Sequence, residues 1–324
     1  MADTIDEQLI KYLADAHSIE EQALQQLRSA PDAAGDEELA RIFREHLTET
    51  EGHEQTIRAR LESRGESPSR VKDLLMRMGG AGFLLFAQVQ PDTPGKLVAH
   101  AYSYEHLEVA SYETLARVAA RAGDEETEAA ASRIRDEEQR MADRLASSFD
   151  VAVEASLREV SPDDLDSQLN SYLADAHAIE AQAISLLDKA PDSAGDPALA
   201  TLYTSHLEET HEHQRAIDRR LEEREAGRSM VKDLAMRAGG LSWGSFFKAH
   251  PDTPGKLAVF AFAFEHLEIA AYEELRRVAE RAGDTETAAL AERILVEERA
   301  AAAKLAGAFD RAVDASLQAV GVGV

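Results

Sequence analysis

The stretch LADAHSIEEQAL, residues 13–24, has the spacing of an amphipathic helix but carries a carboxylate on its apolar face. The apolar positions, three and four residues apart, are Leu9, Leu13, Ala16, Leu24 and Leu27. Glu20 stands among them, where a leucine would be expected, and a lone carboxylate facing a helical core is costly without a partner. The stretch returns as LADAHAIEAQAI, residues 173–184, with Glu180 in the same place. Both carboxylates therefore require something inside the fold to face.

The whole chain repeats itself at an offset of 160 residues. PDAAGD at 31–36 matches PDSAGD at 191–196, and PDTPGKL at 91–97 returns unchanged at 251–257. Such self-similarity is typical of an internal duplication. The sequence predicts two domains, 1–160 and 161–324, which meet at the polar turn SPDDLDS. The shortness of this turn indicates that the halves pack on each other.

Four long helical segments are expected in each half, and no stretch has the period-2 alternation of a strand. In the first half they run over 4–29, 36–64, 95–122 and 125–157. Asp36 is a candidate N-cap of the second. Short loops join helices one to two and three to four, whereas the long, Gly-rich segment 65–93, expected to contain short helical pieces, joins two to three. This connectivity predicts an all-α fold of two tandem ferritin-like four-helix bundles.

The bulk composition excludes several classes of protein. The chain of 324 residues has a net charge of −26, which disfavours nucleic acid and anionic membranes as partners. No apolar run approaches the length of a transmembrane helix, and the acidic N-terminus lacks the pattern of a secretory signal. With no cysteine, there are no disulfides or thiolate metal sites. We expect a cytoplasmic protein.

Each of the four helical seams contains a carboxylate near its middle, and the second also contains histidines. In the first half the candidate metal ligands are Glu20, Glu49, His53, Glu105, Glu108 and Glu138. Their counterparts in the second half are Glu180, Glu209, His213, Glu265, Glu268 and Glu298. Four or five carboxylates converging in one bundle repel each other, and the core offers no lysine or arginine to compensate. Two divalent cations per half would compensate them, with iron or manganese favoured by this donor set and zinc also suitable.

Several assignments stay open at this stage. Either Glu137 or Glu138 occupies the seam of the fourth helix, with Glu138 preferred. His46 lies on the same face as His53 and is either a ligand or an ordinary buried histidine. His17 and His106 flank the carboxylates and are more readily partners that orient a ligand. Tyr112 and Tyr272 are expected in the core, with a redox or hydrogen-bonding role as the alternative.

The order and spacing of these motifs resemble a known family. DAHSIEEQ, then HLTET with a nearby histidine, then EHLEVASYETL and a double glutamate are similar to the ferritin-like YciE/YciF group of bacterial stress-response proteins. The resemblance covers nearly all of each half. It implies a four-helix ferritin-like fold, a di-iron or di-manganese centre, and dimeric packing, which here would become an intramolecular pseudo-dimer.

The chain departs from the Glu-x-x-His pattern that ferritins place on their second and fourth helices. Glu208 and His211 have that spacing, but the first half has Thr48 and Glu51 there. The fourth helix contains no histidine in either half. The predicted site is therefore rich in carboxylates and poor in histidine.

Three functions are compatible with this pattern. The first is a redox-active dimetal protein of ferroxidase, peroxidase or manganese-catalase type, with Glu49 and Glu138 as bridges and O2 or H2O2 as oxidant. The second is a metal-binding or iron-sequestering protein without turnover. The third is a metal-free structural stress protein whose buried carboxylates are partly protonated. Metal content separates the third from the others, and turnover separates the first from the second.

Overall fold

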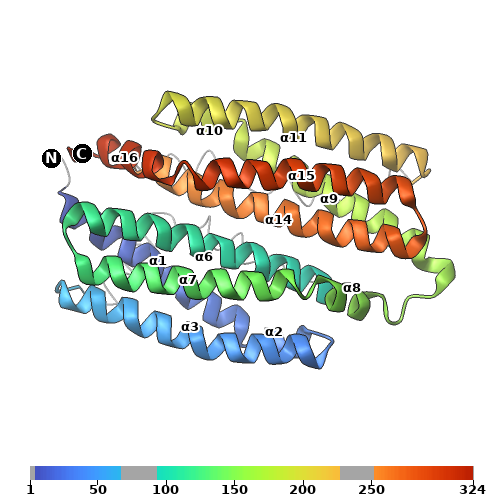
Figure 1. The fold of residues 1–324 in the computed structure, drawn as a ribbon, viewed down its shortest axis with the longest axis horizontal. Coiled ribbons are helices and arrows are strands. Elements are labelled where there is room, and N and C mark those ends of the chain that lie inside the picture. The colour runs from blue at the N-terminus through green and yellow to red at the C-terminus, as the bar shows by residue number, and fades with distance from the viewer. Residues whose placement is uncertain (1–3, 67–92, 227–251, 324) are drawn as a thin grey trace.

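The computed structural model describes residues 4–66, 93–226 and 252–323, and in these ranges the regular structure is entirely helical (Figure 1). The long helices of the first half are α1 (Ile5–Leu27), α3 (Glu37–Ser63), α6 (Pro94–Ala122) and α7 (Glu125–Ala146). Two short helices, α2 (Ala30–Ala33) and α8 (Phe149–Leu157), follow α1 and α7. The all-α prediction is confirmed.

The ends of these helices are set by capping side chains. The Thr4 hydroxyl accepts from the backbone N–H of Glu7, and Asp36 accepts from that of Glu38 at the start of α3, as expected from the sequence. Gly123 ends α6 in the left-handed conformation, with φ of 68°. One residue later, Asp124 caps α7, which produces a tight antiparallel turn.

The first-half helices close into a four-helix bundle. The helix α1 packs on α3 and α6, and α7 packs on α6 and α3. The predicted hairpins, α1 with α3 and α6 with α7, are therefore present, and the fold is ferritin-like. The helical pieces predicted in the crossover between α3 and α6 lie outside the described residues.

The second half repeats this arrangement. Its helices are α9 (Leu165–Leu187), α10 (Ala190–Ser193), α11 (Pro197–Glu223), α14 (Thr253–Ala282), α15 (Thr285–Ala306) and α16 (Phe309–Ala319), after a 3-10 turn, η1 (Pro162–Asp164). The helix α9 packs on α11 and α14, and α15 packs on α14 and α11. The tandem ferritin-like architecture is confirmed, while the division at residue 160 stays a prediction.

The predicted fourth helix over 125–157 is wrong in one respect, because it is two helices. The hydroxyls of Ser147 and Ser148 donate to the carbonyls of Asp143 and Arg144 at the break. The second half breaks at the equivalent place, between α15 and α16, where Gly307 and Ala308 have no hydroxyl, so these bonds accompany the break and are not its cause. The break releases α8, which packs against both α6 and α14.

The two halves pack through α6 and α14, which lie side by side at the centre of the molecule (Figure 1). Equivalent contacts cross this interface in both directions: Lys96 pairs with Asp175 at 3.1 Å, and Lys256 pairs with Asp15 at 3.0 Å. The rings of His106 and His266, equivalent residues, stack with centroids 3.4 Å apart. The halves are therefore related by an approximate two-fold axis, as the expected pseudo-dimer requires.

A single large hydrophobic cluster contains side chains of both halves, from Leu97 on α6 to Phe260 on α14. Burial of this shared surface holds the two bundles together. Among the helices described, none combines the length and apolar character that crossing a membrane requires.

Candidate metal centre

Two groups of potential metal ligands lie in the core of the first bundle and share one carboxylate. One group comprises His46, Glu105, Glu108 and Glu138, and the other comprises Glu20, His53 and Glu138. Within each group the donor atoms lie within 4.8 Å of one another. The second bundle repeats both groups with His206, Glu265, Glu268 and Glu298, and with Glu180, His213 and Glu298. Each half therefore contains two neighbouring groups of side chains that could hold a metal ion.

Helical spacing brings these side chains together. His46 and His53 are seven residues apart on α3, which is two turns on one face. Glu105 and Glu108 are three apart on α6 and point the same way. Glu20 on α1 and Glu138 on α7 complete the layer, so that each of the four long helices contributes.

The donor atoms are buried and many have no hydrogen-bond partner. Glu20, Glu138 and His46 have no exposed surface, and Glu108 is only 1% exposed. Both carboxylate oxygens of Glu108 and both of Glu138 lack a hydrogen bond, as do His46 Nε2 and His53 Nδ1. Buried polar atoms are nearly always satisfied in folded proteins, and each orphan needs an explanation. Cations coordinated by these atoms would supply one, so the donor set fits a metal pair.

The shared carboxylate lies between the two histidines. Glu138 Oε1 is 2.7 Å from His53 Nδ1, and Glu138 Oε2 is 3.5 Å from His46 Nε2. His46 Nε2 is also 3.1 Å from Glu105 Oε2. One oxygen of Glu138 therefore belongs to each group, which is the arrangement of a bridging carboxylate.

Each of these histidines turns its other ring nitrogen to a partly exposed carboxylate. His46 Nδ1 is 3.2 Å from Glu49 Oε2, and His53 Nε2 is 2.9 Å from Glu137 Oε2. The second half repeats these contacts, with His213 Nε2 2.6 Å from Glu297 Oε2. In metalloproteins such a carboxylate fixes the ring orientation and raises the basicity of the ligating nitrogen.

A tyrosine holds the carboxylate of α1. The hydroxyl of Tyr112 donates a short hydrogen bond to Glu20 Oε1, and that of Tyr272 donates one to Glu180 Oε1. Both tyrosines are buried. Both lie in the core, as expected from the sequence, and they also have the hydrogen-bonding role that was the alternative, while Glu20 Oε2 has no hydrogen-bond partner.

Burial makes the carboxyl groups reluctant to ionise when no cation is present. It raises the pKa of Glu20 to about 8 and that of Glu105 to about 7. Burial also raises the pKa of Glu108 well above its usual range, and the charge of Glu138 adds to the effect. The same residues of the second half, Glu180 and Glu265, have pKa values of about 8 and 7.

Glu138 and the histidines, by contrast, favour their charged forms. Burial favours the neutral form of Glu138, but its contact with His53 and the charge of His46 outweigh burial and lower its pKa. Burial likewise opposes a charge on His53, yet the carboxylate of Glu138 raises its pKa to about 9. In the metal-free centre protons therefore take the positions where cations would bind, and cations must displace them.

In each half the structure brings together all the predicted ligands except one, the glutamate at position 49 or 209. Glu20, His53, Glu105, Glu108 and Glu138 converge as expected, together with their counterparts Glu180, His213, Glu265, Glu268 and Glu298. The side chain of Glu49 is instead 50% exposed and contacts the outer nitrogen of His46, and Glu209 makes the same contact with His206 at 3.4 Å. Neither belongs to the buried groups.

The structure also places the residues whose roles the sequence left open. Glu138 rather than Glu137 is fully buried, and His46 and His206 join the groups. The equal spacing of His46 and His53 in both halves was the signal that could have identified His46 from the sequence. The remaining histidines lie outside the groups: His17 Nε2 contacts Glu54 at 2.9 Å, His106 stacks on His266, and His211 is partly exposed on α11.

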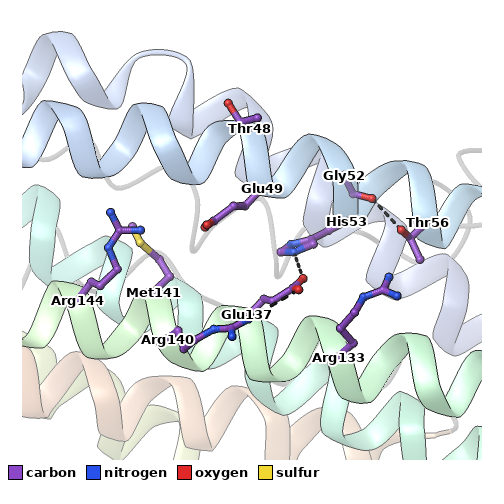
Figure 2. Close-up of a pocket in the computed structure, with 10 residues that line it drawn as sticks. All are labelled: Thr48, Glu49, Gly52, His53, Thr56, Arg133, Glu137, Arg140, Met141 and Arg144. Atoms are coloured by element: carbon purple, nitrogen blue, oxygen red, sulfur yellow. Dashed lines mark hydrogen bonds and ion pairs between the residues drawn. The ribbon is translucent and has the colours of Figure 1, made fainter.

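A cleft of about 490 Å³ leads from the surface to His53, one member of the buried groups (Figure 2). It lies between α3 and α7, with the buried side chains of His53 and Met141 at its base. Glu49 and Glu137, the two outer carboxylates, line its sides. The centre is thus shielded by helices but has an approach along the α3–α7 seam.

Comparison with known proteins agrees with this architecture. The family described as "Domain of unknown function (DUF892)" matches residues 4–158 and again residues 164–318. Protein YciF of Escherichia coli (strain K12) is 32% identical over 127 residues, which cover 37% of this chain and 75% of that protein. No solved structure has significant similarity to the chain.

Proposed function

The chain belongs to the DUF892 family as a tandem duplication, and from that premise we propose that each half binds two metal ions and that the protein is a redox-active dimetal-carboxylate protein. The observation that carries this proposal is Glu138, a fully buried carboxylate that faces a different histidine with each oxygen, at 2.7 Å from His53 Nδ1 and 3.5 Å from His46 Nε2. A bridge between two cations accounts for its position.

In this proposal one metal position is held by Glu20, His53 and Glu138, and the other by His46, Glu105, Glu108 and Glu138. Carboxylates with one imidazole at each position suit iron or manganese, and zinc is also compatible. Glu49 accepts a hydrogen bond from the outer ring nitrogen of His46, and Glu137 accepts one from that of His53. These bonds fix the orientation of the two rings.

When bound, a pair of iron or manganese ions exchanges electrons with O2 or H2O2, as in ferroxidase, peroxidase or catalase chemistry. The chain supplies the surroundings for that chemistry. The helices keep bulk water from the ligands, the tyrosine hydroxyl holds Glu20, and the cleft beside His53 admits a small oxidant. In a ferroxidase, Fe(II) is the substrate, and the acidic protein would concentrate it.

Metal analysis after anaerobic loading with Fe(II) or Mn(II) tests the proposal. We expect about four ions per chain, close to none after Glu138→Ala with Glu298→Ala, and about two after Glu20→Ala with Glu180→Ala, because only Glu138 and Glu298 belong to both positions. Glu62→Ala with Glu222→Ala, which removes exposed carboxylates at equivalent positions, is the matched control. An unaltered chain that binds no metal would overturn the proposal.

Turnover then separates the redox function from metal sequestration. Loaded protein should consume H2O2, or O2 in the presence of Fe(II), faster than free metal does. Metal retained without such turnover would favour a storage function. A cytoplasmic location and a role in stress response belong to the same proposal and rest on the cysteine-free composition and on the family resemblance.

A further inference from the structure

The two halves present nearly the same inner centre behind different outer surfaces. In the first half, three arginines of α7 line the cleft across from His53: Arg133, Arg140 and Arg144 (Figure 2). They are seven and four residues apart, so they lie along one face of the helix, spaced over about 16 Å. The cleft is therefore bordered by a row of guanidinium groups in a protein whose overall charge is strongly negative.

These guanidinium groups are only partly engaged. No carboxylate of the described residues lies within ion-pair distance of Arg133, which is exposed. Arg140 Nη2 is 3.7 Å from Glu137 Oε1, beyond hydrogen-bond distance. Arg144 uses Nη2 for Glu45, at 2.6 Å, and retains its other N–H groups. Donors for an additional acceptor therefore remain along the row.

Each of the two carboxylates that line the cleft contacts a histidine. Glu49 faces His46, and Glu137 faces His53. Glu137 also lies 3.7 Å from Arg140 Nη2, so the two carboxylates offset the three guanidinium groups only in part.

The equivalent surface of the second half has fewer positive and more negative side chains. Arg140 and Arg144 are replaced by Ala300 and Lys304. The ammonium of Lys304 already lies 3.6 Å from Glu209. Across from it, Thr48 and Gly52 are replaced by the exposed residues Glu208 and Glu212.

We propose that the cleft of the first half binds a small inorganic oxyanion beside His53, and that the second half has no such site. Planar guanidinium groups donate paired hydrogen bonds to oxyanions, whereas a rim of carboxylates repels them. The site consists of protein groups alone, so it does not depend on metal. Only its use, delivery of an anionic ligand or oxidant to one of two unequal centres, rests on the proposed function.

Titration calorimetry of the full chain with inorganic phosphate at low ionic strength tests this inference. The expected result is one phosphate per chain, with affinity that falls as salt increases. The double variant Arg140→Ala with Arg144→Lys, which installs the residues of the second half, should bind at least tenfold more weakly. Arg293→Ala, the second-half equivalent of Arg133→Ala, is the matched control and should leave phosphate binding unchanged.

A reciprocal variant tests the asymmetry directly. Glu208→Thr, Glu212→Gln and Ala300→Arg together should raise the stoichiometry from one phosphate to two. The inference is overturned if the unaltered chain binds no phosphate, or if it binds two. Unchanged affinity in the Arg140 and Arg144 double variant would also overturn it, since the phosphate would then lie on metal or elsewhere. None of these outcomes bears on whether the chain binds metal, which is measured separately.

Discussion

At the scale of single residues, position on α3 decides which side chains form the centre. On a helix with about 100° per residue, Glu49 lies about 60° to one side of His46, and Thr50 lies about 40° to the other. Thr50 is fully buried, whereas half of the Glu49 side chain is exposed. The centre therefore lies on the Thr50 side of the histidines, and Glu49 is left at the rim.

This position gives a prediction that separates an orienting carboxylate from a ligand. Glu49→Gln with Glu209→Gln should leave the number of bound metal ions unchanged but weaken their binding about 10- to 100-fold, because the outer nitrogens of His46 and His206 lose an anionic partner. Competition with a chelator of known affinity measures this. A fall in stoichiometry would instead identify Glu49 as a ligand, as predicted from the sequence.

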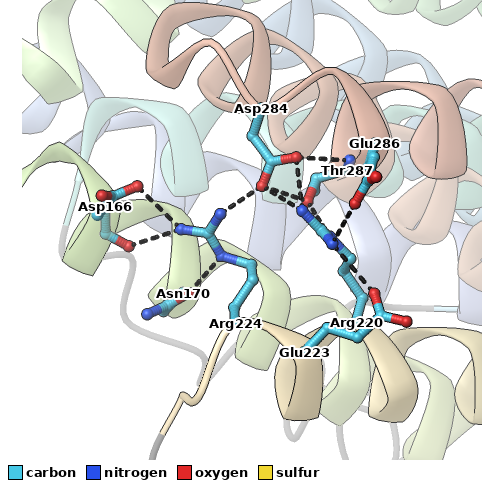
Figure 3. A network of polar contacts seen from close by, with 8 residues as sticks. All are labelled: Asp166, Asn170, Arg220, Glu223, Arg224, Asp284, Glu286 and Thr287. Carbon is cyan, nitrogen blue, oxygen red and sulfur yellow. Dashed lines mark hydrogen bonds and ion pairs between the residues drawn. The ribbon is translucent and has the colours of Figure 1, made fainter.

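At the scale of elements, the helices within each bundle are joined to one another where they begin and end. Asp284 caps α15 by accepting from the backbone N–H of Thr287 at 2.9 Å. The same carboxylate binds Arg220 at 2.7 Å and also Arg224, both from the last turns of α11 (Figure 3). One aspartate thus joins the start of one helix to the end of another, and Asp124 does the same with Arg60 and Arg64.

Loss of this junction should destabilise the fold measurably. Asp284→Ala removes a cap and two ion pairs, and we expect it to lower the free energy of unfolding by about 2–3 kcal/mol in urea titrations at neutral pH. Asp192→Ala, at an exposed position of α10, should change it little. Hydrogen bonds from Thr287 and Arg220 outweigh burial and lower the pKa of Asp284 to about 2. The loss should therefore diminish as the pH falls from about 4 toward 2.

At the scale of the whole molecule, close approach between the halves depends on glycine. A Cβ atom at Gly255, near the start of α14, would lie 2.8 Å from the hydroxyl of Tyr12 on α1 and 2.9 Å from Ser316 Oγ. The backbone N–H of Gly255 also donates to Ser316 Oγ, and Gly95 makes the equivalent bond to Ser156. No larger residue fits at these two crossing points without displacing a neighbour.

Substitution there should therefore weaken the packing of the halves. Gly255→Ala should lower the free energy of unfolding by about 1–3 kcal/mol. Gly52→Ala, in the middle of α3 with no atom within 4 Å of the new Cβ, should instead raise it by about 0.5–1 kcal/mol. Chemical denaturation of both variants provides the comparison, and equal effects would refute this account of the interface.

The same interface contains a carboxyl group that should make stability depend on pH. Glu274 lies beside Gly95 and Ser156 of the other half, its Oε1 has no hydrogen bond, and the first half has Thr114 at this position. Burial, with the charge of Asp175 adding to it, raises the pKa of Glu274 to about 8.

Because the folded state keeps this proton above pH 4.5 while the unfolded chain releases it, Glu274 lowers stability progressively from about pH 5 to pH 8. Glu274→Thr should thus become more stable relative to the unaltered chain as the pH rises, by on the order of 3 kcal/mol at pH 8. Melting temperatures of the two chains across this range measure the trend, and Glu274→Gln should behave similarly. A difference independent of pH would contradict the burial of an uncharged carboxyl group.

The sequence by itself determined the helices, the duplication and the carboxylates in the seams. Spacing of three and four residues, with capping residues such as Asp36 and breaks such as Gly123, is local information, and it sufficed for the long helices of each half. Glu20, Glu105, Glu108 and Glu138 were predicted because a charged residue in an apolar seam is visible without knowing its neighbours. The single helix predicted over 125–157 was wrong because the chain breaks between Ala146 and Phe149, and at the equivalent residues of the second half, where the apolar periodicity gave no signal.

Only the tertiary structure decided how each helix is turned toward the centre and how the halves differ in their surroundings. Glu49 and His46 lie only about 60° apart around α3, and the packing of α3 against α1 and α7 buries His46 while Glu49 stays at the rim. The arginines of α7 likewise border a cleft only because α3 packs across from them, which the sequence of α7 alone does not indicate. Rotation about a helix axis and the position of neighbouring helices are properties of packing, which the periodicity of one segment does not contain.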